Sequence, residues 1–117
     1  MTEAISECWA LVEECAENGW DGNDGAPISA IAAQRATAFI RVLPAQFPLP
    51  EMAPEPDGAI SLDWIRSRDR VFSLSIGAGR RLPYAWIDRT DSGHAVAFFD
   101  GTTVPPRMLE AIRRIMD

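Results

Sequence analysis

Apolar residues recur every three or four positions near the start of the chain and every second position from about residue 58 onward. Between residues 2 and 18 they fall on one side of a helix, which is typical of an amphipathic helix packed on a core. Thr2 stands where an N-cap is expected, and Gly19 stands where a helix commonly ends. The side that we expect to be buried consists of Ile5, Cys8, Trp9, Val12, Cys15 and Ala16.

A second helix is predicted over residues 30–43, after a glycine-rich loop at residues 20–27. Ser29 precedes this helix as an N-cap residue. Two sides of it are apolar, so we expect it to be covered on more than one side. One side carries Ile28, Ala32, Ala36, Phe39 and Leu43, and the other carries Ile31, Ala38 and Val42.

Residues 44–58 contain five prolines, which excludes a helix and predicts an extended connector. We expect a short edge strand near Met52, because proline is tolerated at the edge of a sheet. From residue 59 to 99 apolar and polar residues alternate, as they do in half-buried strands. The strands are predicted over residues 59–65, 71–76, 82–88 and 94–99, with turns at 77–80 and 90–93. Connections this short join antiparallel neighbours.

Residues 104–117 predict a closing helix that begins at Pro105-Pro106 and carries one apolar stripe. The fold class is therefore α+β, with two N-terminal helices, a four- or five-stranded antiparallel meander, and a C-terminal helix on the same sheet face. The whole chain, 1–117, reads as a single domain with a helical part at 1–43, a connector at 44–58, a sheet at 59–99 and the closing helix.

Charge is spread unevenly along the chain, whose net charge is −6. Residues 1–65 hold 11 acids against two arginines, which is −9, and residues 66–117 hold 6 acids against 9 arginines, which is +3. An acidic stripe on the first helix suits capture of a basic partner, with Trp20 in the following loop as an anchor. The alternatives are a solvated helix face and a tryptophan lid over the core. The proposed partner-binding residues are Glu3, Glu7, Glu14, Glu17 and Trp20.

Arginines at the ends of predicted strands give an alternative binding surface for anions or nucleic acid. These residues are Arg66, Arg68, Arg70, Arg80 and Arg81. A net charge of −6 repels a polyanion at long range, so we expect no nucleic-acid binding.

Chemistry-bearing motifs are sparse, and we expect no enzymatic activity, metal or cofactor. His94 is the only histidine, and no G-x-S-x-G nucleophile motif occurs. Cys8 and Cys15 lie seven residues apart on a predicted helix, too far for a disulfide, and form no C-x-x-C pair. The N-terminus lacks the basic start of a signal peptide, and no apolar run is long enough to span a bilayer. We therefore expect a cytoplasmic protein without a membrane partner.

Three stretches together resemble a family of small bacterial hypothetical proteins without an established activity. The first is Trp20-Asp21-Gly22 followed by Ala26-Pro27-Ile28-Ser29, and the second is Pro54-x-Pro56-Asp57-Gly58-x-Ile60-x-Leu62-x-Trp64. The third is Phe99-Asp100-Gly101 before Pro105. The chain departs from the family pattern after His94, where Ala95-Val96-Ala97 replaces an expected glycine and polar residues. The resemblance implies a bacterial origin and a shared fold, and it implies no activity.

The polar face of the predicted sheet has no helix assigned to cover it. It carries Ser61, Asp63, Ser73 and Ser75, which either face solvent or pair with another chain. Together with the acidic stripe, this face favours a protein-interaction role. The expected forms are an antitoxin-like or inhibitor-type acidic partner of another protein, or a protein that associates with itself as a homodimer.

Overall fold

The computed structural model describes residues 2–17, 19–20, 22 and 25–117, with Thr2 and Glu3 described through their backbone only. The elements are α1 (Thr2–Glu14), α2 (Ala30–Val42), β1 (Glu51–Pro54), β2 (Ile60–Ser67), β3 (Arg70–Ile76), β4 (Arg81–Asp88), β5 (Asp91–Phe98) and α3 (Pro106–Met116). The α+β class and the predicted order of helices and strands are confirmed.

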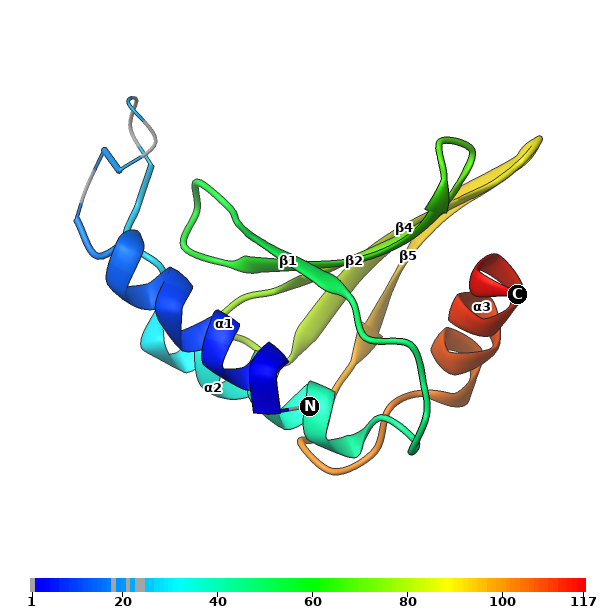
Figure 1. The fold of residues 1–117 in the computed structure, drawn as a ribbon, viewed down its shortest axis with the longest axis horizontal. Coiled ribbons are helices and arrows are strands. Elements are labelled where there is room, and N and C mark those ends of the chain that lie inside the picture. Colours follow the sequence, from blue (N-terminus) through cyan, green and yellow to red (C-terminus); the bar gives the residue numbers. More distant parts are fainter. Residues whose placement is uncertain (1, 18, 21, 23–24) are drawn as a thin grey trace.

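The five strands form one antiparallel meander in the order β1-β2-β3-β4-β5. The sheet is twisted, and all three helices lie on one side of it, which we call the concave side (Figure 1). The opposite side is called the convex side. The edge strand expected near Met52 is present as β1. The spatial order of the strands is the same as their order in the sequence, so each strand pairs with its sequence neighbours, as short connections require.

The core lies between the concave face of the sheet and the helices. The sheet contributes Ile60, Leu62, Trp64, Phe72, Leu74, Ile76, Leu82 and Tyr84, and α3 contributes Met108, Ile112 and Ile115. The ring of Phe39 on α2 packs edge-on against Trp64 and Phe99. Helix α1 packs on α2 and β1, whereas α3 packs on β2 and β3. One continuous cluster therefore joins all layers.

The first helix ends at Glu14, four residues earlier than predicted. A continued helix would bond the Gly19 N–H to the Cys15 carbonyl. Instead that carbonyl accepts a hydrogen bond from the Ile28 N–H at 3.0 Å, and the Gly19 N–H donates to the Gly25 carbonyl. The returning loop thus takes the backbone partners that another helical turn needs, and α1 stops.

Three residues predicted for the buried sides are exposed, namely Trp9 on α1, Ala16 just after it, and Ile31 on α2. Trp9 is 40% exposed, because the buried side of α1 is the narrower one formed by Ala4, Cys8 and Cys15. Ile31 on α2 is also exposed, so the second apolar side of that helix is only partly covered. The predicted N-cap is confirmed, since the Ser29 side chain accepts a hydrogen bond from the Ala32 N–H at 3.2 Å.

The turn between β4 and β5 lies at Arg89-Thr90, not at residues 90–93 as predicted. Asp88 pairs with Asp91 across a two-residue hairpin, and Arg89 adopts the positive φ of 61° that such a tight hairpin uses. Strand β5 consequently begins three residues earlier than expected. Gly93, which we assigned to the turn, lies inside the strand opposite Trp86.

Candidate interaction surfaces

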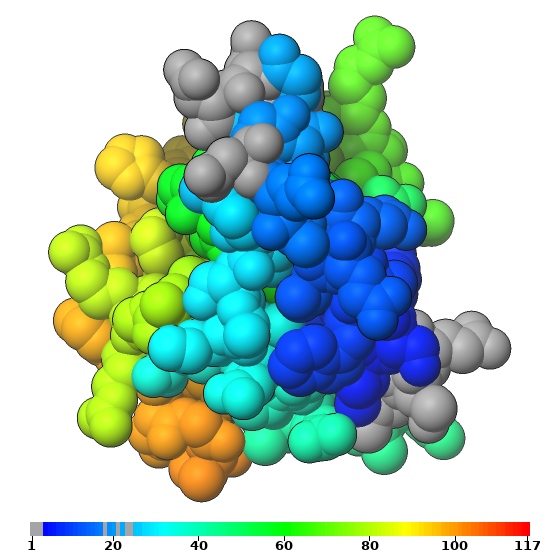
Figure 2. Space-filling model, turned by 90° about the vertical axis from the view of Figure 1, so that its left-hand side faces the viewer, coloured from blue at the N-terminus to red at the C-terminus, as the bar shows by residue number. Residues whose placement is uncertain are grey.

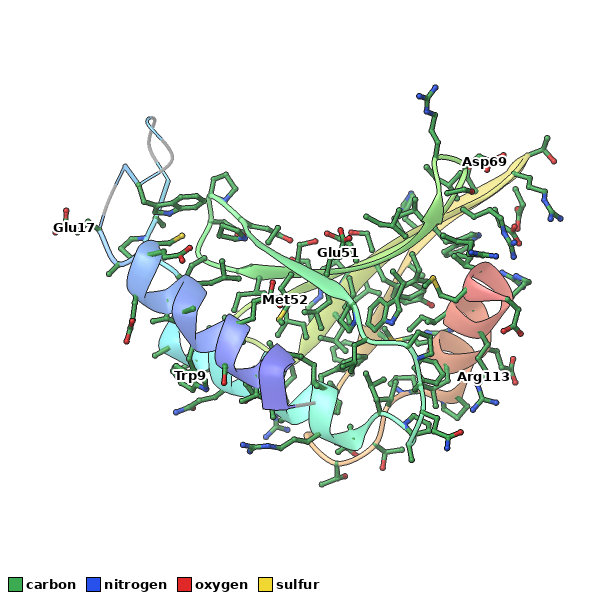
Figure 3. The ribbon with its side chains drawn as sticks, viewed as in Figure 1. Trp9, Glu17, Glu51, Met52, Asp69 and Arg113 are labelled. Atoms are coloured by element: carbon green, nitrogen blue, oxygen red, sulfur yellow. The ribbon has the colours of Figure 1, made fainter. Side chains whose placement is uncertain are left out.

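The convex face of the sheet is covered by no helix within the described part of the chain (Figure 1). Glu51 lies on this face, on the opposite side of the sheet from α3 and its Arg113 (Figure 3). Large apolar side chains are exposed on it at Ile65, Ile87, Val96 and Phe98. Phe98 is the most open of them at 68%. They form two groups, Ile65 with Ile87 near the β2–β3 turn and Val96 with Phe98 toward the other end of the sheet. Exposed apolar groups of this kind are typical of an interaction surface.

The polar residues predicted for this face do lie together at its centre. The Asp63 carboxylate accepts hydrogen bonds from the hydroxyls of Ser61, at 2.8 Å, and Ser73, at 2.5 Å. The Ser75 hydroxyl donates to Glu55 at 3.0 Å. Burial is the main cause that raises the pKa of Glu55, and the nearby carboxylates Asp57 and Asp63 raise it further. The centre of the open face is thus a hydrogen-bonded, partly desolvated acidic group.

A shallow hollow of about 320 Å³ lies beside this centre, lined among others by Ser75, Pro83 and His94. Its origin is a break in the β3–β4 ladder. Regular pairing ends at Leu74 and Tyr84, one step before Pro83 would face Ser75. Proline has no N–H to donate, so the two strands separate there.

The two edges of the sheet differ. Strand β1 is four residues long, contains Pro54, and is packed against α1. Strand β5 is eight residues long and contains no proline, lysine or arginine. Natural edge strands are usually protected by short length, charge, proline or a covering element. The edge of β5 has none of these over most of its length, and no described helix packs on it.

The alternation of hydrogen bonds identifies which backbone groups of β5 face outward. The Phe99 N–H donates to the Arg80 carbonyl, and backbone hydrogen bonds alternate along an antiparallel pair. The backbone N–H and carbonyl groups of the odd-numbered residues of β5 therefore point toward β4. The outward N–H and carbonyl groups therefore belong to Ser92, His94, Val96 and Phe98. Two of these residues also carry exposed apolar side chains on the convex face, at Val96 and Phe98.

The predicted acidic surface is partly assembled. Glu14, Glu17 and Trp20 line a hollow of about 290 Å³ together with Glu13, which the sequence analysis did not single out. Glu7 is exposed on α1, and the side chain of Glu3 lies outside the described residues. Figure 2 shows α1 and α2 side by side on this face of the molecule.

Trp20 contacts the core and the loop at once. Its indole N–H donates to the Ala26 carbonyl at 2.5 Å, and its side chain packs partly buried against the core. These contacts are those of a lid that holds the loop. The ring also lines the acidic hollow, so the residue retains a surface that a partner can touch.

The predicted arginine cluster is not brought together. Arg66 and Arg68 lie at the β2–β3 turn, whereas Arg80 and Arg81 lie at the β3–β4 turn. The length of β3 separates the two groups by roughly 20 Å at about 3.3 Å per residue. Arg70 is engaged within the chain, since it lies 3.6 Å from Asp88 and donates to the Arg114 carbonyl. The five arginines therefore form no single anion-binding surface.

The two cysteines are buried and unpaired. Burial is the main cause that raises the pKa of the Cys8 thiol to about 11, with a contribution from Glu7. Its Sγ lies 3.7 Å from the Ala33 carbonyl. Within the described residues, no three histidine, cysteine or acidic side chains gather as ligands for a metal ion. Among the described helices, none combines the length and apolar character needed to cross a membrane.

Comparison of the chain with protein-family models, curated proteins and solved structures gave no match. The resemblance to a bacterial family therefore stays an expectation. Function has to be argued from the surfaces themselves.

Proposed function

We propose that the chain is a non-enzymatic protein-interaction module that pairs with a second copy of itself through β5. The observation that carries this proposal is the unprotected edge of β5, whose outward backbone groups adjoin exposed Val96 and Phe98. Pairing two such edges antiparallel about a two-fold axis satisfies both rows of backbone groups and continues the sheet.

The exposed side chains of the convex face also favour pairing with a second copy of the chain. A second copy placed edge to edge brings its own Val96 and Phe98 next to those of the first, which removes apolar surface from water on both sides. Cross-strand pairs that involve aromatic and β-branched residues add roughly 0.2–1 kcal/mol each. The opposite edge, β1, offers no such surface because α1 packs against it.

Sedimentation velocity over a range of protein concentrations tests this function. We expect a reversible dimer for the wild-type chain. Val96→Pro removes one outward N–H without touching the β4–β5 ladder, and we expect it to be monomeric. Val96→Thr keeps both the N–H and the β-branched shape and should still dimerise. A wild-type chain that stays monomeric at every concentration contradicts the proposal, as does a Val96→Pro variant that dimerises as tightly as wild type.

The acidic surface supplies a second candidate partner, a basic protein. Glu13, Glu14 and Glu17 surround the hollow beside Trp20, and the first 34 residues hold seven acids and no basic side chain. Such a surface raises the rate of encounter with a basic protein, as expected for an antitoxin-like or inhibitor-type subunit. The chain would then act as a dimer in which each protomer captures a basic partner on the acidic surface of α1 and the following loop.

Affinity purification with mass spectrometry tests this second candidate. The variant changes Glu3, Glu7, Glu14 and Glu17 to glutamine, and a control changes Glu51 and Glu110 instead. We expect one stoichiometric basic partner with the wild type and the control and none with the variant. Recovery of the same partner with the fourfold glutamine variant would contradict a role of the acidic surface in binding.

A further inference from the structure

A second cavity lies on the concave side, between α3 and the inner face of β4 and β5, with a volume of about 350 Å³. It exists because α3 packs on β2 and β3, while the inner positions of β5 are small. These positions are Gly93, Ala95 and Ala97. The volume is in the range of sites for small ligands.

The wall on the helix side is cationic. Arg107 and Arg114 lie two turns apart on α3 and both line the cavity, with Glu110 between them. Arg114 contacts Asp88 through its Nε at 3.4 Å, but its side chain is 57% exposed. Arg107 has no ion pair with any described residue. The three charged side chains that line the cavity sum to one positive charge, which matches a ligand with one negative charge.

The wall on the sheet side is aromatic. The rings of Tyr84 and Trp86 lie 6.0 Å apart at 32° to one another, and both line the cavity. The Trp86 indole N–H is buried and finds no acceptor among the described residues. An unpaired buried donor is unfavourable, so an oxygen atom near this ring edge would be stabilising.

We propose that this cavity binds a small aromatic monocarboxylate. The planar ring packs on Trp86 and Tyr84, and the carboxylate takes the guanidinium groups of Arg107 and Arg114, whose planar donors match carboxylate geometry. The site is separate from the convex face and the edge of β5, because α3 lies on the concave side of the sheet (Figure 1). Its occupancy therefore does not depend on dimerisation.

NMR titration of the full chain tests the proposal, with the indole N–H signal of Trp86 as the readout. The probes are naphthalene-2-carboxylate, its neutral carboxamide, and inorganic phosphate, which has charge but no ring. We expect the carboxylate to shift the Trp86 signal saturably and the carboxamide to bind at least about tenfold more weakly, a difference of about 1.4 kcal/mol. Phosphate alone should leave the signal in place.

Matched variants of α3 complete the test. Arg107→Gln and Arg114→Gln should each weaken carboxylate binding about tenfold, as expected for loss of a charge-assisted hydrogen bond. Arg113→Gln is the control, because Arg113 lies over the Phe47 ring and not in this cavity. All three residues are exposed, so the fold tolerates the changes. Equal affinity for carboxylate and carboxamide, an equal loss with Arg113→Gln, or no shift at millimolar carboxylate would overturn the proposal.

Discussion

The indole ring of Trp86 lies directly against the α-carbon of Gly93 on the neighbouring strand. A Cβ atom added at residue 93 would lie 2.5 Å from Trp86 Cζ2 and 2.8 Å from Cη2. The two residues pair across β4 and β5, and the large Trp86 ring packs over Gly93 because glycine has no side chain there. The relationship sets the position of Trp86 in the wall of the α3 cavity.

Gly93→Ala should therefore destabilise the fold by about 1–3 kcal/mol, as overpacking usually does. To relieve the clash, the Trp86 ring has to tilt away from residue 93 or the backbone of β5 has to shift, and either change disturbs the packing between the two strands. Gly79→Ala is the control, because a Cβ there meets nothing within 4 Å. Urea unfolding followed by tryptophan fluorescence compares them. Equal stability of the two variants would show that Trp86 has room to move.

Glu55→Gln should stabilise the protein at neutral pH. The folded-state pKa of Glu55 is raised by burial above its unfolded value of about 4.3, so ionisation at higher pH disfavours the folded state. The wild type loses this stability as pH rises through the interval between the two pKa values, while glutamine keeps a partner for the Ser75 hydroxyl.

Thermal unfolding from pH 3 to 8 checks this prediction. The gain from Glu55→Gln should be largest near neutral pH and should vanish once Glu55 is protonated in both states. Glu51→Gln removes the same charge from an exposed position of β1 and is the control. A gain of the same size at every pH would mean that the charge of Glu55 is not the cause.

The Cys8 thiol should resist alkylation in the folded protein. Burial and a pKa near 11 leave little thiolate at pH 8, and the thiolate is the reactive form. Iodoacetamide labelling followed by mass spectrometry should show slow modification of Cys8 that tracks unfolding by urea. Rapid labelling of Cys8 without denaturant would contradict the burial of this face of α1.

Alternation and helical periodicity predicted most elements, because each reports which side of a segment meets the core. The end of α1 was missed, since it is decided by a hydrogen bond from Ile28 to Cys15 that no local pattern reveals. The β4–β5 turn was misplaced because Gly93 suggests a turn by its type, although here it makes room for Trp86.

The candidate surfaces were less predictable than the fold. The alternation of apolar and polar residues alone was enough to predict that Ser61, Asp63 and Ser73 share one face of the sheet. The arginines were grouped because they fall at ends of adjacent predicted strands, although Arg70 and Arg80 flank one strand and must lie at its opposite ends. The α3 cavity depends on which strands α3 covers, which periodicity does not specify. The small inner residues of β5 leave room for the cavity, but the sequence analysis placed Gly93 in a turn and predicted no cavity from them.

Salt-dependent gel shifts check the nucleic-acid alternative. Because the five arginines are divided between two ends of β3, we expect no shift of random DNA or RNA even at low salt. A shift lost in an Arg66→Gln, Arg68→Gln double variant but kept in an Arg80→Gln, Arg81→Gln variant would place a nucleic-acid site at the β2–β3 turn and contradict this account.

Hydrogen exchange of single amides in β5 tests the self-pairing most directly. The amides of His94 and Val96 face away from β4, whereas those of Ala95 and Ala97 bond to it. We predict that His94 and Val96 are protected at high protein concentration and lose protection on dilution, while Ala95 and Ala97 stay protected throughout. Fast exchange of His94 and Val96 at every concentration, with Ala95 and Ala97 protected, would show that the edge of β5 stays unpaired and would contradict the account.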